Sequence, residues 1–194
     1  MIIGITGGTG CGKTTLLQIL EEVGCVVLDC DAIYHKLLKT DPSLLAAIDA
    51  RFPNVVENGV LKREALGLFV FSNPAALQDL NQITHSAVKQ EVLHVLNTKP
   101  KLAAIDAIGL FESGLNQLCQ LTVAVTAPDD QRIARLMARD NISEKYARIR
   151  IAAQRPQKEF EALCDHTLVN NGSETAFREK CLVFLQKQGI ITLS

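Results

Sequence analysis

Short runs of apolar residues alternate along the chain with longer stretches whose apolar positions recur every three to four residues. Residues 1–6 (MIIGIT) form the first run, and Leu16, Ile19 and Leu20 follow at helical spacing before Gly24. A short apolar, β-branched run is typical of a buried strand, and the helical spacing indicates an amphipathic helix. The start of the chain therefore predicts a strand, a loop and a helix that ends at the glycine.

The same alternation continues along the rest of the chain. Further apolar runs, which we expect to be strands, stand at residues 25–28, 102–106, 121–126 and 166–170. Helical patterns stand at residues 31–38, 42–48, 62–96 with a break at Asn73-Pro74, 129–153 and 175–187, whereas residues 51–59 are typical of a loop. Strands that alternate with helices favour an α/β fold around a parallel sheet.

The segment between the second and third predicted strands, about residues 30–100, is far longer than one crossover helix requires. It predicts a helical insert within a single domain of residues 1–194. In open α/β sheets, ligands bind at the carboxyl ends of the strands, so we expect the functional site at that edge.

Composition narrows the classes of function. The chain has 194 residues, 47% of them apolar and 21% charged, which is ordinary for a soluble globular protein. A formal net charge of −1 argues against nucleic acid as the main partner. No apolar stretch approaches the ~18 residues of a membrane span. Six scattered cysteines, without a CxxC pair or a basic leader before the first apolar run, indicate reduced thiols and a cytoplasmic location.

The sequence GGTGCGKT at residues 7–14 fits the phosphate-loop pattern and lies between a predicted strand and a predicted helix. Glycines let backbone N–H groups approach phosphate oxygens, Lys13 would neutralise phosphate charge, and the hydroxyl of Thr14 would hold Mg²⁺. The helix that follows points its positive end at the anion. The residues expected to bind the nucleotide are Gly8, Gly10, Cys11, Gly12, Lys13, Thr14 and Thr15. A simple glycine-rich turn is the alternative.

Two carboxylates, Asp29 and Asp31, follow the second apolar run. They should lie at the carboxyl edge of the sheet beside the phosphate loop. A carboxylate there can orient an acceptor hydroxyl and take its proton, and we assign this role to Asp31. Either aspartate could instead cap the helix that follows. Both roles can be filled, because two carboxylates are present.

A series of motifs along the chain, taken in order, resembles the sequences of dephospho-coenzyme A kinases. The motifs are Thr6–Thr14, Asp29-Cys30-Asp31 with His35, Phe52-Pro53 with Gly59, Leu66-Gly67 with Val70-Phe71 and Pro74, and Ile83 with His85. The likeness continues through residues 106–115, 131–139, 148–154 and 165–173, and so covers nearly the whole chain. It implies the three-layer P-loop kinase fold, a five-stranded parallel sheet flanked by helices. The core would occupy about residues 1–30, 100–130 and 163–194, the acceptor-binding insert about 31–99, and a lid about 131–162.

The resemblance also implies the chemistry. Such kinases move the γ-phosphate of ATP, with Mg²⁺, to the ribose 3′-hydroxyl of dephospho-CoA, a small-molecule substrate. Asp31 would be the base, and Lys13 would act with it in catalysis. Three further residues would lie near the acceptor pocket: His35, Phe71 and His85. His85 could equally be an ordinary helix histidine, and Phe71 or Tyr34 a core residue.

Asp106 ends the third predicted strand, where an acid can hold Mg²⁺ or orient the acceptor. Glu112 follows and could contact the acceptor or cap the next element. Between them the chain departs from the family, with Ile108 and Gly109 in place of Pro and Leu. The departure keeps open a kinase of nucleosides, nucleoside monophosphates or another small hydroxyl acceptor. A nucleotide-binding regulator without turnover is a further alternative, but a regulator would not need a base.

An arginine-rich stretch coincides with the expected lid at about residues 131–162. It could be a solvated face of salt bridges, but the resemblance favours a lid over ATP. We expect Arg139, and next Arg148, to contact phosphate or adenine, with Arg139 assisting catalysis and most other arginines at the surface. Asn170 and Gly172 would pass their backbone beside the adenine, although a simple turn is the alternative.

Cys11 occupies a loop position where the family commonly has serine. A thiol beside a helix N-terminus and Lys13 should have a lowered pKa and be open to oxidation. The alternative is a buried, inert thiol.

Overall fold

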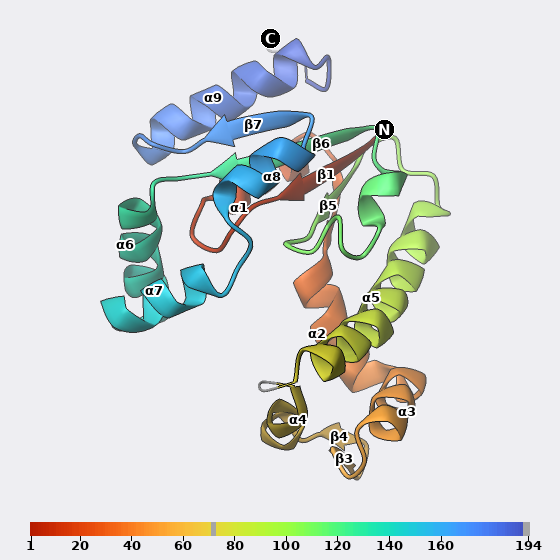
Figure 1. Ribbon diagram of the computed structural model, residues 1–194. Helices are drawn as coiled ribbons and strands as arrows, with labels where there is room; N and C mark the ends of the chain where they lie inside the picture. Colours follow the sequence, from red (N-terminus) through yellow and green to blue (C-terminus); the bar gives the residue numbers. More distant parts are fainter. Residues whose placement is uncertain (71–72, 192–194) are drawn as a thin grey trace. The chain divides into compact units, whose positions relative to one another are not determined.

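The structure is a computed structural model that describes residues 1–70 and 73–191, and the chain forms two compact units (Figure 1). The first unit comprises Met1–Val27 and Pro100–Ser194, and the second comprises Leu28–Lys99. The second unit is therefore an insertion into the sequence of the first.

The first unit is built around a parallel sheet. Its strands are β1 (Ile2–Thr6), β2 (Val26–Asp29), β5 (Ala103–Asp106), β6 (Leu121–Thr126) and β7 (His166–Val169), in the order β2-β5-β1-β6-β7. Strand β1 pairs with both β5 and β6, so that Ile3 lies opposite Ala104 on one side and Leu121 on the other. These strands are almost wholly buried, as is typical of parallel strands covered on both faces. The predicted α/β fold with a five-stranded parallel sheet flanked by helices is confirmed.

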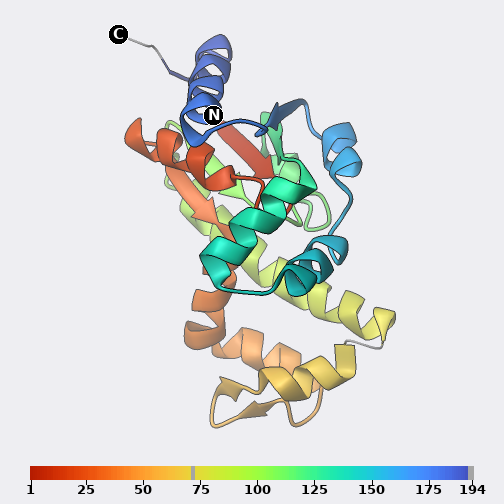
Figure 2. The ribbon, with the colours of Figure 1, turned by 90° about the vertical axis from the view of Figure 1, so that its left-hand side faces the viewer.

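The first unit also contains helices. They are α1 (Lys13–Glu22), α6 (Asp129–Asp140), α7 (Glu144–Ala152), α8 (Gln157–Leu163) and α9 (Glu174–Lys187), with a short 3-10 helix at Leu115–Leu118. Helices α1 and α9 pack together and against the strands (Figure 2), through Leu16 and Leu20 of α1 and Phe177 and Leu185 of α9. Burial of each such side chain contributes about 1.5–3 kcal/mol. This packing fixes α1, the helix that follows the phosphate loop.

The second unit is mainly helical. Its helices are α2 (Cys30–Thr40), α3 (Pro42–Arg51), α4 (Arg63–Val70) and α5 (Pro74–Leu96). Asp29, Asp41 and Asn73 each accept a hydrogen bond from an amide group in the first turn of the helix that follows. Pro42 and Pro74 come directly after such caps, where a missing N–H costs no helical hydrogen bond. The helices predicted for this segment are confirmed.

The loop predicted over residues 51–59 is wrong in its last part, because a small antiparallel hairpin forms there. Strand β3 (Val56–Glu57) pairs with β4 (Val60–Leu61). The turn between them is Asn58-Gly59, and both residues have positive φ, 51° and 73°. An Asn-Gly pair between apolar residues is a strong hairpin signal, since both residues tolerate this conformation. The hairpin was therefore predictable from the sequence.

The single helical stretch predicted over residues 129–153 is two helices. Asn141 ends α6 in the left-handed conformation, with φ at 52°, and asparagine adopts it at lower cost than most residues. Ser143 then caps α7 by accepting a hydrogen bond from Tyr146 N at 3.3 Å. Helix α8 follows and was not predicted. Within the part of the chain that the structure describes, no helix has the length and apolar character to cross a membrane.

Candidate active site

The phosphate loop joins β1 to α1, and a glycine begins the helix. Gly12 takes a left-handed conformation, with φ at 96°, at the N-cap of α1. A Cβ at this position would fall against the side-chain amide of Asn170, so both the conformation and the close approach require glycine. Since glycine brings no side-chain oxygen to cap α1, the positive end of the helix dipole is available to an anion.

Lys13 lies between the loop and the end of β5. Its Nζ donates a hydrogen bond to Gly7 O at 2.9 Å and lies 3.9 Å from Oδ1 of Asp106. The sheet register explains this proximity, because Asp106 is the last residue of β5 and lies opposite Ile5 of β1. The side chains of Lys13 and Asp106 are only 14% and 16% exposed, so solvent and salt screen their attraction less than at the surface. Two predicted site residues thus meet at the carboxyl edge of the sheet.

Two arginines of α6 support the outer side of the loop. Arg132 Nε donates to Thr9 O at 3.0 Å, and Arg135 Nη1 donates to Gly10 O at 3.2 Å. The expectation that arginines of this stretch other than Arg139 and Arg148 lie mostly at the surface is wrong for Arg132, which is 3% exposed. A signal was present in the sequence, since Arg132 stands four residues before the buried Leu136 and hence on the apolar face of α6.

Asn170, at the end of β7, completes this support. Its Nδ2 donates to Cys11 O at 3.0 Å, and its Oδ1 accepts a hydrogen bond from Arg135 Nη2 at 3.2 Å. Asn170 is buried, and its own N–H donates to Thr126 O at 2.7 Å. The side chain of Asn170 therefore fixes the loop, which the sequence did not predict. An adenine contact by the backbone at Asn170 and Gly172 remains a prediction.

Cys11 is buried under the loop, and the predicted lowering of its pKa is wrong. The thiol is 1% exposed, and its Sγ donates to Gly8 O at 2.7 Å. Burial raises the pKa of Cys11, because removing a thiolate from water outweighs the attraction of Lys13 and Arg132. The structure thus supports the alternative of an inert thiol.

Arg139 and Arg148 lie on the exposed side of α6 and α7. Arg139 Nε donates to Asp140 at 2.6 Å, and Arg148 Nη2 donates to Glu144 at 2.6 Å. Their side chains are 61% and 63% exposed. Hydrogen bonds from Arg139 and Arg150 hold the pKa of Asp140 far below its usual range. Contact of Arg139 and Arg148 with ATP remains a prediction.

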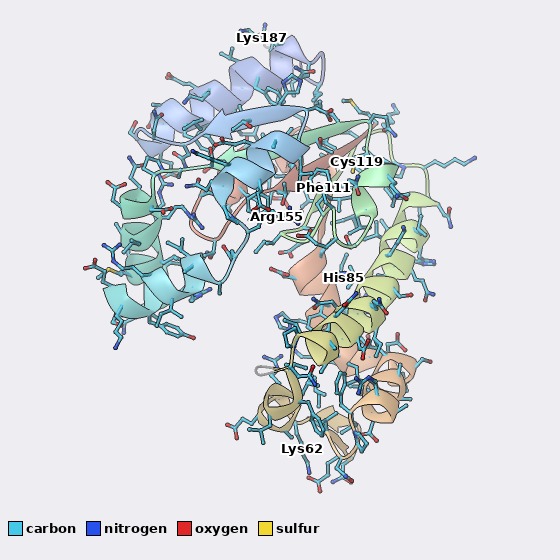
Figure 3. All side chains as sticks on the ribbon, in the orientation of Figure 1. Lys62, His85, Phe111, Cys119, Arg155 and Lys187 are labelled. Carbon is cyan, nitrogen blue, oxygen red and sulfur yellow. The ribbon has the colours of Figure 1, made fainter. Side chains whose placement is uncertain are left out.

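Glu112 lies in the turns that follow β5 and is bound by Arg155, which Figure 3 labels. Arg155 Nη2 and Nε donate to Oε1 of Glu112 at 2.6 and 3.1 Å, and its Nη1 donates to Glu159 at 3.1 Å. The carboxylate of Glu112 thus has a cationic partner from the segment between α7 and α8. Its predicted contact with the acceptor is untested.

In the second unit, the two acids at and just beyond the end of β2 divide the roles that the sequence left open. Asp29 is the N-cap of α2, because its Oδ1 accepts a hydrogen bond from Ala32 N at 2.9 Å. Asp31 lies in the first turn of the same helix and is exposed. Since Asp29 already caps the helix, Asp31 is not required for that purpose and can serve as the base.

His35 borders a pocket of about 210 Å³ within the second unit. Arg63 Nη2 lies 3.3 Å from His35 Nδ1, and burial raises the pKa of Tyr34, which also lines the pocket. The remaining lining residues are mostly apolar: Leu38, Leu61, Leu66, Gly67 and Val70. His85 lies partly buried on α5 (Figure 3), and Phe71 lies outside the described residues. Acceptor contacts by these residues are still predictions.

The magnesium prediction concerns Thr14 and Asp106. A hydroxyl and a carboxylate supply oxygen donors, which Mg²⁺ prefers, and Mg²⁺ in kinase sites usually takes its other ligands from substrate phosphates and water. Across residues 1–70 and 73–191, no group of three or more His, Cys, Asp or Glu side chains could hold a metal ion. The oxygen donors of Thr14 and Asp106 fit Mg²⁺ chemically, and an Mg²⁺ site at these residues remains a prediction.

The chain also matches known proteins over most of its length. A family model described as dephospho-CoA kinase covers residues 1–176. The chain belongs to the dephospho-CoA kinase family. The resemblance that the motifs indicated is confirmed, and membership of this family makes the protein a kinase-type phosphotransferase.

Individual relatives agree with this family. Dephospho-CoA kinases from Carboxydothermus hydrogenoformans and Geobacillus kaustophilus are 35% and 33% identical, over 96% of this chain and 93% and 96% of theirs. The structure of a Campylobacter jejuni dephospho-CoA kinase aligns with a TM-score of 0.68 at 26% identity, over 98% of both chains. TT1252 from Thermus thermophilus aligns with a TM-score of 0.82 at 32% identity, over 97% of both chains. A shikimate kinase from Acinetobacter baumannii, 16% identical with a TM-score of 0.51 over 100% of this chain and 95% of its own, shares the fold.

Proposed function

We propose that this protein transfers the γ-phosphoryl group of ATP to the ribose 3′-hydroxyl of dephospho-CoA and so forms CoA and ADP. The observation that carries the proposal is the phosphate loop with Lys13 beside Asp106, within a chain of the dephospho-CoA kinase family. The amide groups of the loop and the first turn of α1 receive the phosphates. Lys13 offsets the negative charge of the β- and γ-phosphates, and this charge shifts toward the ADP leaving group during the transfer.

Asp31 takes the proton of the acceptor hydroxyl. The hydroxyl oxygen forms a bond to the γ-phosphorus while the bond from that phosphorus to the ADP oxygen breaks, and the proton passes to the Asp31 carboxylate. The exposed position of Asp31 supports this assignment, together with the capping of α2 by Asp29. A carboxylate that is free of a structural task can orient the hydroxyl for in-line attack.

Thr14 and Asp106 would hold Mg²⁺ through their oxygen atoms, with Lys13 beside Asp106. When bound, the ion supplies positive charge that stabilises the transferring phosphoryl group. Helices α6 and α7 are assigned as a lid that excludes water, with Arg139 and Arg148 available to the phosphates. We place the reaction in the cytoplasm, which the six free cysteines support.

The direct test is ATP-dependent conversion of dephospho-CoA to CoA by the purified protein. A panel of nucleosides and nucleoside monophosphates, assayed for ADP release, serves as the comparison. A preference for one of those acceptors over dephospho-CoA would overturn the proposed substrate. ATP binding without ADP release on any acceptor would indicate a regulator.

A matched pair of variants tests the base. Asp31→Asn and Asp29→Asn each remove one negative charge from the start of α2, and asparagine is itself a good helix cap. We expect Asp31→Asn to lower kcat by about 10²-fold or more, with ATP binding largely intact, and Asp29→Asn to change it little. Unchanged turnover in Asp31→Asn would remove Asp31 as the base.

A further inference from the structure

The backbone of Thr9, in the turn of the phosphate loop, is held on both sides of the residue. Its N–H donates to Gln154 Oε1 at 2.8 Å, and its carbonyl accepts a hydrogen bond from Arg132 Nε at 3.0 Å. The two side chains also meet, since Arg132 Nη2 lies 3.5 Å from Gln154 Oε1. Arg132 and Gln154 thus form a closed arrangement with the two peptide groups that flank Thr9, which we call the Thr9 clasp.

The buried guanidinium of the clasp has an acceptor for each of its nitrogens. Besides the bonds to Thr9 and Gln154, Arg132 Nη1 donates to Asp129 Oδ1 at 3.0 Å. The guanidinium packs directly against Gly8, where a Cβ would clash with Nη2. A buried charge is tolerated only when it is paired and hydrogen-bonded. Arg132 is therefore committed to this position and holds Gln154 beside the loop.

The clasp joins parts of the first unit that are far apart in sequence. Arg132 and Gln154 lie 123 and 145 residues after Thr9. Arg132 lies in the first half of α6, whereas Gln154 directly follows Ala153, the C-cap of α7. The α6–α7 pair that we assign as the lid is therefore tied to the phosphate loop at both of its ends.

We propose that Gln154 is a positioning residue for ATP, which holds the Gly8–Thr9 peptide in the orientation that suits phosphate binding. The proposal rests on the proposed function only for the identity of the nucleotide. The Gly8–Thr9 peptide cannot rotate without breaking its bond to Gln154, and the Thr9–Gly10 peptide cannot rotate without breaking its bond to Arg132. When only a fraction of the molecules has a competent loop, the apparent Kd rises by the inverse of that fraction.

The main test compares two glutamine variants. Gln154→Leu removes the acceptor of the Thr9 N–H with little change in volume. Gln120→Leu is the matched control, since Gln120 Oε1 likewise accepts a backbone N–H, that of Ile2, at 2.6 Å. We expect Gln154→Leu to raise the Kd for ATP about tenfold by titration calorimetry without acceptor, and Gln120→Leu to stay within about twofold of the unsubstituted protein.

A conservative variant separates positioning from general stability. Gln154→Glu keeps an oxygen for the Thr9 N–H and offers a carboxylate to Arg132, so its Kd should stay within about threefold. In steady-state kinetics, the KM for ATP should follow the Kd, while the KM for dephospho-CoA stays within about twofold in Gln154→Leu. A structural role alone would lower the melting temperature without this division between the two substrates.

Three results would overturn the proposal: an unchanged Kd in Gln154→Leu, an equal rise in Gln120→Leu, or a Kd for Gln154→Glu as weak as that of the leucine variant. If Gln154→Leu does not fold, Gln154→Asn carries the same test, because the shorter side chain stays polar but withdraws the acceptor from the Thr9 N–H, so that ATP binding should also weaken. Failure of the proposed function looks different. The unsubstituted protein would then bind ATP but leave dephospho-CoA unchanged, and the comparison of Kd values would still decide the clasp.

Discussion

The inner and outer sides of α6 carry the same type of side chain in opposite settings. On the inner side, Arg132 and Arg135 donate to carbonyls of the phosphate loop. On the outer side, Arg139 pairs with the adjacent Asp140, as Arg148 of α7 pairs with Glu144 in its own helix. Backbone carbonyl acceptors are held in place by the fold. Surface carboxylates are mobile, and water competes with them for the arginine's hydrogen bonds. The contribution of an arginine to the stability of the fold is therefore set by its partner and its burial. The number of arginines in a segment does not predict that contribution.

The largest effect should come from the inner side. Arg132→Met should lower the free energy of unfolding by about 3 kcal/mol, because it removes a buried guanidinium and leaves the partly buried carbonyl of Thr9 and side chain of Gln154 without their donor. Urea denaturation measures the change. Arg148→Met is the control, as it removes the same group from an exposed pair. A loss below about 1 kcal/mol in Arg132→Met would break the distinction between the two sides.

Arg139 sharpens the comparison, since its pair with Asp140 is exposed and therefore easy to exchange for a phosphate. Arg139→Ala should lower kcat by about 10²-fold, because it removes charge stabilisation from the transferring phosphoryl group. The free energy of unfolding should change by less than about 0.5 kcal/mol. Steady-state kinetics and urea denaturation measure the two quantities. If kcat stays within about twofold, Arg139 is a surface residue without a role in transfer.

Asp165 extends the comparison to an exposed carboxylate that binds backbone. It accepts hydrogen bonds from N and Oγ1 of Thr122, both at 2.7 Å, and these bonds lower its pKa. Because the folded-state pKa lies below the unfolded one, this stabilisation is present above the unfolded pKa and is lost as the pH falls through the folded pKa. Asp165→Asn should therefore lower the free energy of unfolding by about 1 kcal/mol at neutral pH.

Denaturation of Asp165→Asn and the unsubstituted protein across a pH series checks the sign. The difference should shrink as the pH falls through the folded-state pKa, since both side chains are then uncharged. A difference that is constant with pH would show that lost packing, and not the carboxylate, is responsible.

The smallest effect should come from the exposed pair on α7. Arg148→Ala should change the free energy of unfolding by less than about 0.5 kcal/mol, because the bond to Glu144 joins two solvated side chains one helical turn apart. Thermal unfolding at low and high salt measures this. A larger, salt-sensitive loss would mean that outer ion pairs matter as much as inner ones.

Features with a local signal were predictable from the sequence. The phosphate loop follows from residues 7–14, and the meeting of Lys13 with Asp106 follows from strand ends that share one edge of a sheet. The Thr9 clasp was not predictable in this way. Gln154 lies 145 residues from the peptide that it binds, and no spacing rule relates the two positions.

The prediction of a lowered pKa for Cys11 was wrong for a related reason. Its neighbours in sequence, Lys13 and the start of α1, both lower a thiol pKa, and both can be recognised from the sequence alone. Burial raises it and outweighs them, but burial depends on how α6 and β7 close over the loop. A charge nearby in sequence can be read directly, whereas desolvation is known only once the chain has folded.

The central place of β1 in the sheet has a consequence for synthesis of the chain. Ile2 pairs with Ala103 and Ile3 with Leu121, so both neighbours of the first strand emerge from the ribosome long after it. Contacts between such distant residues form slowly, and the nascent strand stays exposed while it waits. The hydrogen bond from Asn170 to the carbonyl of Cys11 can form only later still, because Asn170 is synthesised after both neighbouring strands. The protein should therefore become able to bind nucleotide only late in translation. Until then its first apolar run is exposed and can bind chaperones.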